Sequence, residues 1–190
     1  FYVASGWAVV FSLHATKVLG VGEGGLVVFG DVEAAESFRE WANFGFSGKR
    51  ESTGSSTNAK LSEIASAWGL AALDGIDQEA EEWSAAQEMA RATISELGLA
   101  NITQTYPTFN PYAIAKFSDG PELERAEEKL QERGIGTRRW WPVPLHKMSA
   151  FPDSVETLPN ADKLSSMLLG LPLYRRIPAQ VYDDISEILG

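Results

Sequence analysis

The sequence predicts an α/β fold with two packing units, and three observations support this prediction. Residues 7–13 and 24–30 are short apolar runs, rich in valine and aromatic side chains, as expected of strands. Apolar residues at helical spacing follow these runs, and a second series of strand and helix begins after Leu99. The chain has 190 residues, which is enough for one domain or for one domain and part of another.

The first unit opens with the two apolar runs, which we expect to form buried strands. Asp31 is expected to be the N-cap of a helix over residues 31–46, with acidic residues in its first turn. The apolar positions of this helix lie three or four apart, as one helix face requires: Val32, Ala35, Phe38 and Ala42. The polar Gly/Ser segment 45–57 is expected to be a mobile loop.

Two further helices are expected to complete this part of the chain. Asn58 is placed at the start of the first, which runs to residue 73, because asparagine is favoured at helix N-caps. Its apolar stripe consists of Leu61, Ile64, Ala65, Trp68 and Ala72. The second helix runs over 76–98 and ends at Gly98, a suitable C-terminal cap.

The second unit is expected to contain one strand, an extended segment and three helices. Residues 105–118 end in a strand in which Tyr112 and Ile114 alternate with other residues. A helix over 121–134 has Pro121 in its first turn and Gly134 just past its end. The remaining elements are an extended segment with two prolines and two helices: residues 135–146, 161–170 and 178–189.

Composition and charge exclude several classes of function. The chain has no cysteine, so disulfides and cysteine-ligated metals are excluded, and we expect no metal site. The formal net charge of −10 disfavours nucleic acid and anionic lipid as partners. No apolar run approaches the roughly 20 residues that span a bilayer. These features predict a soluble cytoplasmic protein without a membrane or nucleic acid partner.

The start of the chain is unusual. Phe1 opens an apolar stretch without an initiator methionine, and a buried strand is expected a few residues later. A chain that begins this close to a buried strand is expected to be part of a longer polypeptide.

One lysine stands in a setting that suggests chemistry. Lys17 lies between the apolar run 7–13 and the glycine-rich segment 20–25, and Ser12 precedes it by five residues. A lysine that bonds to the aldehyde of pyridoxal 5′-phosphate needs phosphate donors and space for a flat ring nearby. The Ser12 hydroxyl and a tight glycine turn could supply both. The structural alternative is a solvated lysine at the end of a strand.

Four segments resemble one enzyme family in the same order. They are FSLHATK followed by GEGG, STNAKLSEIASAWGLAAL, PVPLH, and the closing LGLPLYRRIPAQVYDDISEIL. The sequence resembles the PLP-dependent sugar aminotransferases of the DegT/DnrJ/StrS type, and corresponds to the C-terminal half of such a chain. The resemblance implies a fold type I PLP-dependent transferase. Residues 1–75 would complete the large PLP-binding domain, and 76–190 would form a connecting helix and the small α+β domain.

The resemblance also implies roles for four residues. Lys17 matches the lysine that bonds to the cofactor and moves the proton during transamination. Ser12 matches a serine that binds the cofactor phosphate, and Asn58 an asparagine that reaches the phosphate of the neighbouring subunit in a homodimer with shared active sites. His146 matches a position near the sugar substrate. The implied reaction transfers an amino group from an amino acid, glutamate, to a nucleotide-linked keto-deoxysugar.

Three alternatives remain open at this point. A sugar dehydratase of the same family would carry histidine in place of Lys17. A non-catalytic relative would bind the cofactor or the nucleotide sugar only as a ligand, and a truncated fragment would be inactive. The sequence also departs from the family pattern at Ala59 and Lys60, where an aromatic residue and arginine are usual. An aspartate for the pyridine nitrogen is not identifiable.

Overall fold

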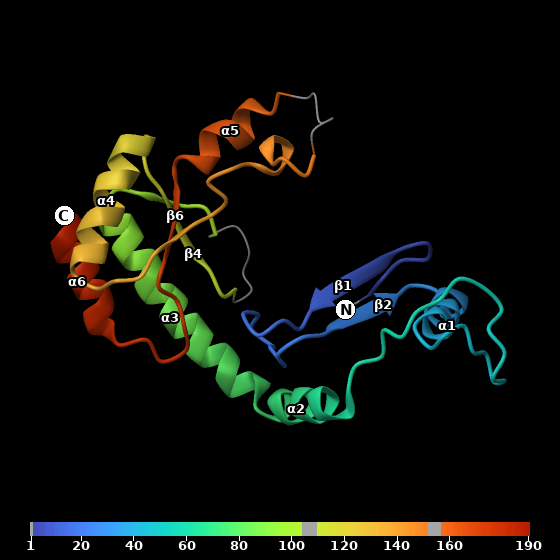
Figure 1. Ribbon diagram of the computed structural model, residues 1–190. Helices are drawn as coiled ribbons and strands as arrows, with labels where there is room; N and C mark the ends of the chain where they lie inside the picture. Colours follow the sequence, from blue (N-terminus) through green and yellow to red (C-terminus); the bar gives the residue numbers. More distant parts are fainter. Residues whose placement is uncertain (1, 104–109, 152–156) are drawn as a thin grey trace. The chain divides into compact units, whose positions relative to one another are not determined.

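The computed structural model describes residues 2–103, 110–151 and 157–190, and these form two compact units that divide between Ile76 and Asp77. Figure 1 shows the order of the elements along the chain. Two parts of the sequence discussed above lie outside the described residues. They are Phe1 and residues 105–109 of the segment in which a strand was predicted. The helices are α1 Val32–Trp41, α2 Glu63–Asp74, α3 Ile76–Glu96, α4 Gly120–Glu132, the 3-10 turn η1 Leu145–Lys147, α5 Pro159–Ser165 and α6 Ala179–Leu189. The strands are β1 Ala8–Ser12, β2 Gly25–Phe29, β3 Ala100–Asn101, β4 Ala113–Lys116, β5 Arg138–Arg139 and β6 Leu168–Leu171.

The first unit contains the antiparallel hairpin of β1 and β2, in register from Ala8 opposite Phe29 to Ser12 opposite Gly25. Both strands were predicted, but the prediction that they are buried is wrong for the chain described here. Val10 is 73% exposed, and no residue of either strand is fully buried. Two strands make only a ribbon, which cannot enclose side chains on both of its faces.

Helix α1 packs on the hairpin through aromatic side chains, with the rings of Phe29 and Phe38 5.4 Å apart. The helix ends at Trp41, five residues earlier than predicted. Asp31 is the N-cap residue by backbone conformation, but its side chain makes no cap hydrogen bond. Its carboxylate instead accepts from Ser5 Oγ and from the Gly6 amide, both at 2.6 Å. These two donors lower the pKa of the Asp31 carboxyl, Ser5 having the larger effect.

Helix α2 begins four residues later than expected. Ser62, and not Asn58, is its N-cap, and the Ser62 hydroxyl accepts from the Ala65 amide at 3.2 Å. The predicted helix start at Asn58 is therefore wrong, because the backbone of Asn58 pairs with Asn43 instead. Helix α3 matches its prediction closely, and Gly98 after it has a φ of +69°, a conformation that favours glycine.

The second unit is a four-stranded antiparallel sheet in the order β3-β4-β6-β5, with α3, α4 and α6 beside it (Figure 1). One core joins β4 and β6 to the three helices, and Ala115, Leu123, Leu169 and Ile185 in it are fully buried. Tyr182 lies in this core and donates its hydroxyl to the Pro172 carbonyl at 2.6 Å. Burial raises the pKa of that hydroxyl.

The predicted helix over 161–170 is wrong in its second half. Helix α5 ends at Ser165, and Leu168–Leu171 form β6, which pairs with both β4 and β5. All four residues of β6 are buried. No local pattern indicates this strand, since a short apolar run fits a buried strand and a buried helix equally well.

Candidate active site

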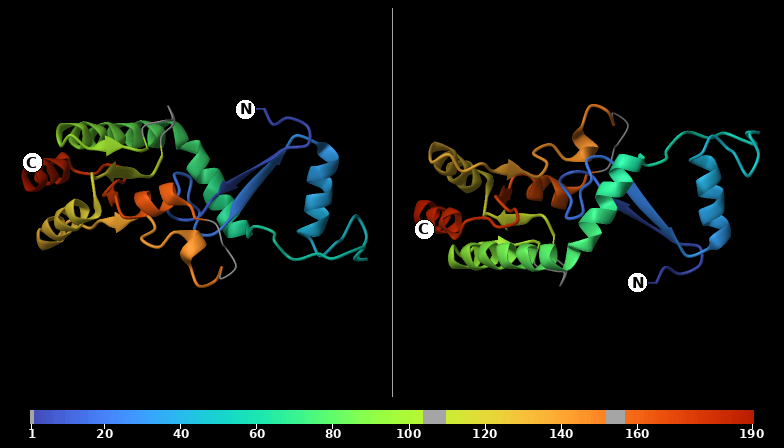
Figure 2. Two further views of the ribbon diagram at one scale, coloured as in Figure 1. Left: turned by 90° about the horizontal axis from the view of Figure 1, so that it is seen from above. Right: turned by 90° about the horizontal axis from the view of Figure 1, so that it is seen from below.

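The turn that carries Lys17 joins β1 to β2, and it is ordered by its own backbone. The Leu13 amide donates to the Gly24 carbonyl at 2.9 Å, and the Ala15 amide donates to Gly22 at 2.7 Å. The Val21 amide donates back to Leu13 at 2.9 Å, and the Val21 side chain is buried. Within the first unit, the turn lies at the end of the hairpin remote from the start of α1 (Figures 1 and 2).

The glycines of this turn are required by its geometry. Gly22 has a φ of +94°, which side chains rarely adopt. A Cβ at Gly20 would lie 2.8 Å from the Ala15 carbonyl oxygen, which is closer than real contacts allow. The glycine-rich segment therefore lets the chain fold back tightly around Lys17, as the sequence suggested.

Lys17 is half-buried, and its amide donates to the His14 carbonyl at 2.8 Å. The His14 ring accepts at Nδ1 from the Thr16 amide at 3.2 Å, so the neutral ring carries its proton on Nε2. That nitrogen lies 3.5 Å from Glu23 Oε1 on the opposite side of the turn. His14 was given no role from the sequence. Its ring contacts Thr16 before Lys17 and Glu23 after it, and so stabilises the turn on both sides of the lysine.

Ser12 lies at the end of β1, opposite Gly25 in the register. Its Oγ accepts from the His14 amide at 3.3 Å, and the side chain is exposed. A hydroxyl that accepts in this way keeps its own hydrogen to donate, for example to a phosphate oxygen. The structure therefore places Ser12 and Lys17 on one turn.

Asn58 belongs to a different segment of the same unit. It pairs with Asn43 just after α1, and its Oδ1 accepts from Lys60 Nζ at 2.6 Å. The segment then reaches the base of the Lys17 turn, where a Cβ at Gly24 would lie 2.7 Å from Leu61 Cδ1. The chain thus links the Asn58 segment to the lysine turn through Leu61.

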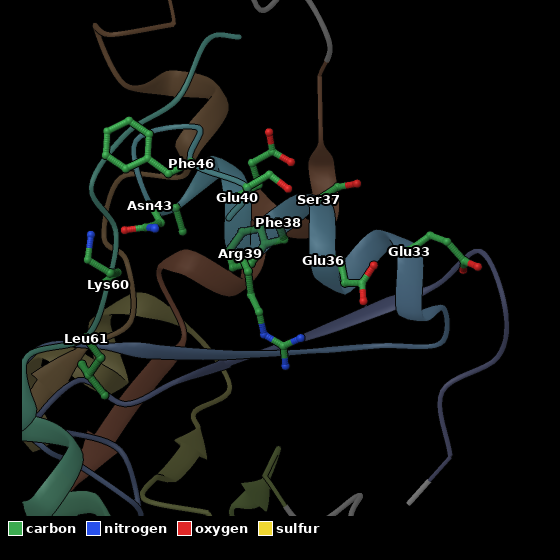
Figure 3. A pocket seen from close by; sticks show the side chains of 12 residues that line it. Glu33, Glu36, Ser37, Phe38, Arg39, Glu40, Asn43, Phe46, Lys60 and Leu61 are labelled. Atoms are coloured by element: carbon green, nitrogen blue, oxygen red, sulfur yellow. The ribbon is translucent and has the colours of Figure 1, made fainter. Parts of the chain in front are cut away.

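A pocket of about 900 Å³ lies beside α1 in the first unit, and Figure 3 shows the side chains around it. Glu33, Glu36 and Glu40 come from the helix, and Asn43 and Lys60 lie on the loop side. This pocket was not predicted from the sequence. The spacing of the three glutamates, three and four residues apart, could have indicated a shared helix face.

His146 lies in the second unit, on the 3-10 turn Leu145–Lys147. Its side chain is only 10% exposed, and Nε2 lies 3.0 Å from Asp162 Oδ1. Lys147 Nζ lies 2.8 Å from the same oxygen. The hydrogen bond from Lys147, and then the charges of Lys147 and His146, lower the pKa of the Asp162 carboxyl. Asp162 was not singled out from the sequence, because its link to His146 is tertiary.

An apolar pocket of about 450 Å³ adjoins His146. Aromatic and aliphatic side chains make up most of its wall: Trp140, Trp141, Pro144, Leu145, Phe151, Leu158 and Ala161, with His146 and Ser165 as the polar members. The rings of Trp140 and Trp141 meet edge to face, with their centroids 6.0 Å apart. Such a surface can hold the apolar face of a ring, with a histidine at its side to make polar contacts.

No group of three or more potential metal ligands occurs in the part of the chain that the structure describes. Within the same residues, no helix is long and apolar enough to cross a membrane. The Lys17 turn and the Asn58 segment together present a lysine amine, a serine hydroxyl and a side-chain amide. These are suitable groups for an aldehyde that also carries a phosphate, which is the combination found in pyridoxal 5′-phosphate.

The chain belongs to the DegT/DnrJ/EryC1/StrS aminotransferase family, which it matches over residues 4–189. Its fold is that of the C-terminal half of a fold type I PLP-dependent aminotransferase. The chain spans about half the length of the relatives that it matches.

Individual relatives agree with this assignment. The dTDP-3-amino-3,4,6-trideoxy-alpha-D-glucose transaminase of Streptomyces venezuelae is 30% identical over 86% of this chain and 44% of its own. Protein Rv3402c of Mycobacterium tuberculosis is 27% identical over 95% of this chain and 44% of its own. A crystal structure of a putative PLP-dependent aminotransferase from Bacillus cereus has a TM-score of 0.87 and 26% identity, covering 98% of this chain and 52% of that one. The structure of DesI with its TDP-sugar product has a TM-score of 0.82 and 28% identity, covering 96% and 48%.

Proposed function

We propose that this chain carries the lysine-bearing part of a PLP-dependent sugar aminotransferase. The enzyme moves an amino group from an amino acid, glutamate, to a nucleotide-linked keto-deoxysugar. The observation that carries the proposal is the turn at the end of the hairpin, where Lys17 and Ser12 are held together by backbone hydrogen bonds in a chain of this family. Relatives named as dTDP-sugar transaminases support the substrate class.

Three residues at the end of the hairpin have roles in this proposal. Lys17 would hold the cofactor through its amine, and once the amino group of the amino acid had replaced it there, the released Nζ would move the proton, as a base when neutral and as an acid when protonated. Ser12 donates its hydroxyl to the cofactor phosphate, and His14 keeps the turn in place through Thr16 and Glu23. When bound, pyridoxal 5′-phosphate supplies the electron sink that the amino transfer requires.

His146 is proposed to contact the nucleotide-sugar substrate. The contact with Asp162 holds its ring beside the apolar pocket, which His146 lines. Residues 1–75 are proposed as the C-terminal part of the large PLP-binding domain, and 76–190 as the connecting helix and small domain. A cytoplasmic location is proposed on the grounds of composition.

The first experiment replaces Lys17 in the complete natural protein. Lys17→Ala should abolish transamination of keto-deoxysugar nucleotides by glutamate, because no other amine lies in this turn. Lys17→Arg should be equally inactive, since a guanidinium does not bond to an aldehyde in this way. Borohydride reduction followed by peptide mass spectrometry should attach the cofactor to Lys17 in the wild type. Near wild-type turnover by Lys17→Ala would refute the proposal.

The second proposal is that Asn58 donates to the cofactor phosphate of the neighbouring subunit in a homodimer. Mixing the Lys17→Ala and Asn58→Ala proteins under exchange conditions tests it directly. In a shared-site dimer the mixed species has one site with both lesions and one intact site. About one quarter of all sites should then bind the cofactor with wild-type affinity. If each site is built from one subunit, no such fraction appears, and sedimentation of an active monomer would also contradict the proposal.

A further inference from the structure

The backbone on both sides of Asn58 is hydrogen-bonded to the end of α1 and the segment that follows it. The Thr57 amide donates to the Trp41 carbonyl, the Phe44 amide donates to Thr57, and the Ala59 amide donates to Ala42, at 2.9, 2.9 and 3.0 Å. We call this pairing of residues 41–44 with residues 57–59 the Asn58 clamp. It holds the Cα of Asn58 in place but leaves the direction of the side-chain amide undetermined.

Lys60 decides the direction of that amide. Its Nζ lies 2.6 Å from Asn58 Oδ1, a short charge-assisted hydrogen bond. An ammonium group has only donors, so the oxygen of the amide must face Lys60. The two N–H donors on Nδ2 then point away from Lys60. In the opposite orientation, the Nδ2 donors of Asn58 would face the Nζ donors of Lys60.

Lys60 is itself held by an aromatic ring. Its Nζ lies 4.4 Å from the centroid of the Phe44 ring, within the range of a cation–π contact. Phe44 has a φ of +60°, which is rare for a large side chain. Such a conformation is unfavourable for a large side chain and persists only where the surroundings impose it. Here the Phe44 amide donates a hydrogen bond to the Thr57 carbonyl in this conformation, and the Phe44 ring lies against Lys60.

We propose that Lys60 is a positioning residue, which orients the Asn58 amide so that its Nδ2 donors meet the cofactor phosphate. This inference rests on the phosphate-binding role proposed for Asn58. One ammonium satisfies both the ring of Phe44 and the amide oxygen of Asn58.

Two other tasks for Lys60 are distinguishable from this one. Lys60 could contact the phosphate directly, as a second positive donor. It also lines the pocket beside α1, together with Glu33, Glu36 and Glu40, so it could serve only to offset their negative charge (Figure 3). Neither task depends on Asn58, whereas positioning depends on it completely.

The experiment is a double-mutant cycle on the affinity of the complete natural protein for pyridoxal 5′-phosphate, measured by equilibrium dialysis. Lys60→Met should weaken binding by roughly 3- to 10-fold, the range of one misplaced hydrogen bond. Lys60→Arg should keep the affinity within about twofold of wild type, because a guanidinium likewise has only donors to offer to Asn58 Oδ1. In an Asn58→Ala background, Lys60→Met should have no further effect. Lys49→Met is the matched control, since it removes the same charge from an exposed position of the same unit.

The outcomes separate this inference from the proposal on which it rests. If Asn58→Ala weakens binding and Lys60→Met does not, the inference is overturned and the role of Asn58 stands. An equal loss on Lys60→Met with and without Asn58 would identify a direct contact and overturn positioning. A loss shared by Lys49→Met would identify a general charge effect, again against positioning. If Asn58→Ala has no effect, both proposals fall.

Discussion

The two units of this chain differ in how they are stabilised. In the first, the only apolar residues that are buried are Val3, Val21 and Ala42 among those that the structure describes. Large side chains there are exposed, including Trp7 at 71%, Ile64 at 80% and Trp68 at 62%. The second unit holds the continuous core that joins β4, β6, α3, α4 and α6.

The residues proposed to bind the cofactor belong to only one of the two units. Ser12, Lys17 and Asn58 all lie in the unit that lacks a core of its own, on segments shaped by backbone hydrogen bonds and glycine geometry. Exposed apolar surface of this extent is typical of a face that other protein covers. The second unit, by contrast, buries a continuous set of apolar side chains between its sheet and its helices.

The largest expected effect is on independent folding. Residues 77–190, expressed alone, should unfold cooperatively on heating, because their core is complete in itself. Residues 1–76 should show no cooperative transition, since a hairpin and two helices with few buried side chains cannot offset their conformational entropy. Circular dichroism melts and the dispersion of amide NMR signals check both statements. A cooperative transition of 1–76 alone would remove the contrast between the units.

The next effect concerns a single core side chain. Leu169→Ala in 77–190 should lower the free energy of unfolding by about 2–5 kcal/mol, because Leu169 is fully buried on the central strand β6. Leu145→Ala is the control with the same chemical change at a side chain that is 63% exposed. It should cost no more than about 0.5 kcal/mol. Urea unfolding measures both, and equal losses would mean that burial in the sheet does not decide stability here.

The smallest expected effect is a pH dependence within the second unit. Arg176 donates to Glu82 Oε1 from Nη2 at 2.6 Å and from Nε at 2.8 Å, and these bonds lower the pKa of the Glu82 carboxyl from 4.5. The pair stabilises the folded state above the unfolded pKa, and this contribution is lost as the pH falls through the lower folded pKa. Glu82→Gln in 77–190 should therefore be less stable than wild type at neutral pH, and the difference should shrink in acid.

Urea unfolding at neutral and acidic pH measures this change. Glu81→Gln is the matched control, because Glu81 is the exposed neighbour on the same helix. A pH-independent loss on Glu82→Gln, or an identical loss on Glu81→Gln, would show that the ion pair with Arg176 is not the cause.

Local patterns were sufficient for the elements whose limits are set by local chemistry. Helices α3 and α4 were predicted with their ends at Gly98 and Gly134, and both glycines have the positive φ values that glycine allows. The Lys17 turn was predicted from its glycines and from the family resemblance, because close backbone approach requires particular residues at particular places. Whether these residues perform the proposed chemistry is a matter for the experiments above.

Only the tertiary structure decided the features that depend on distant partners. Residues 168–171 form a strand because β4 and β5 lie on either side, and their apolar run would suit a helix equally well. Asn58 is not a helix cap because Asn43 pairs with its backbone, and its amide is oriented by a lysine that is itself held by Phe44. Asp162 meets His146 across two separate elements. Spacing along a chain determines helix faces and turns, but contacts between segments depend on which surfaces the rest of the fold brings together.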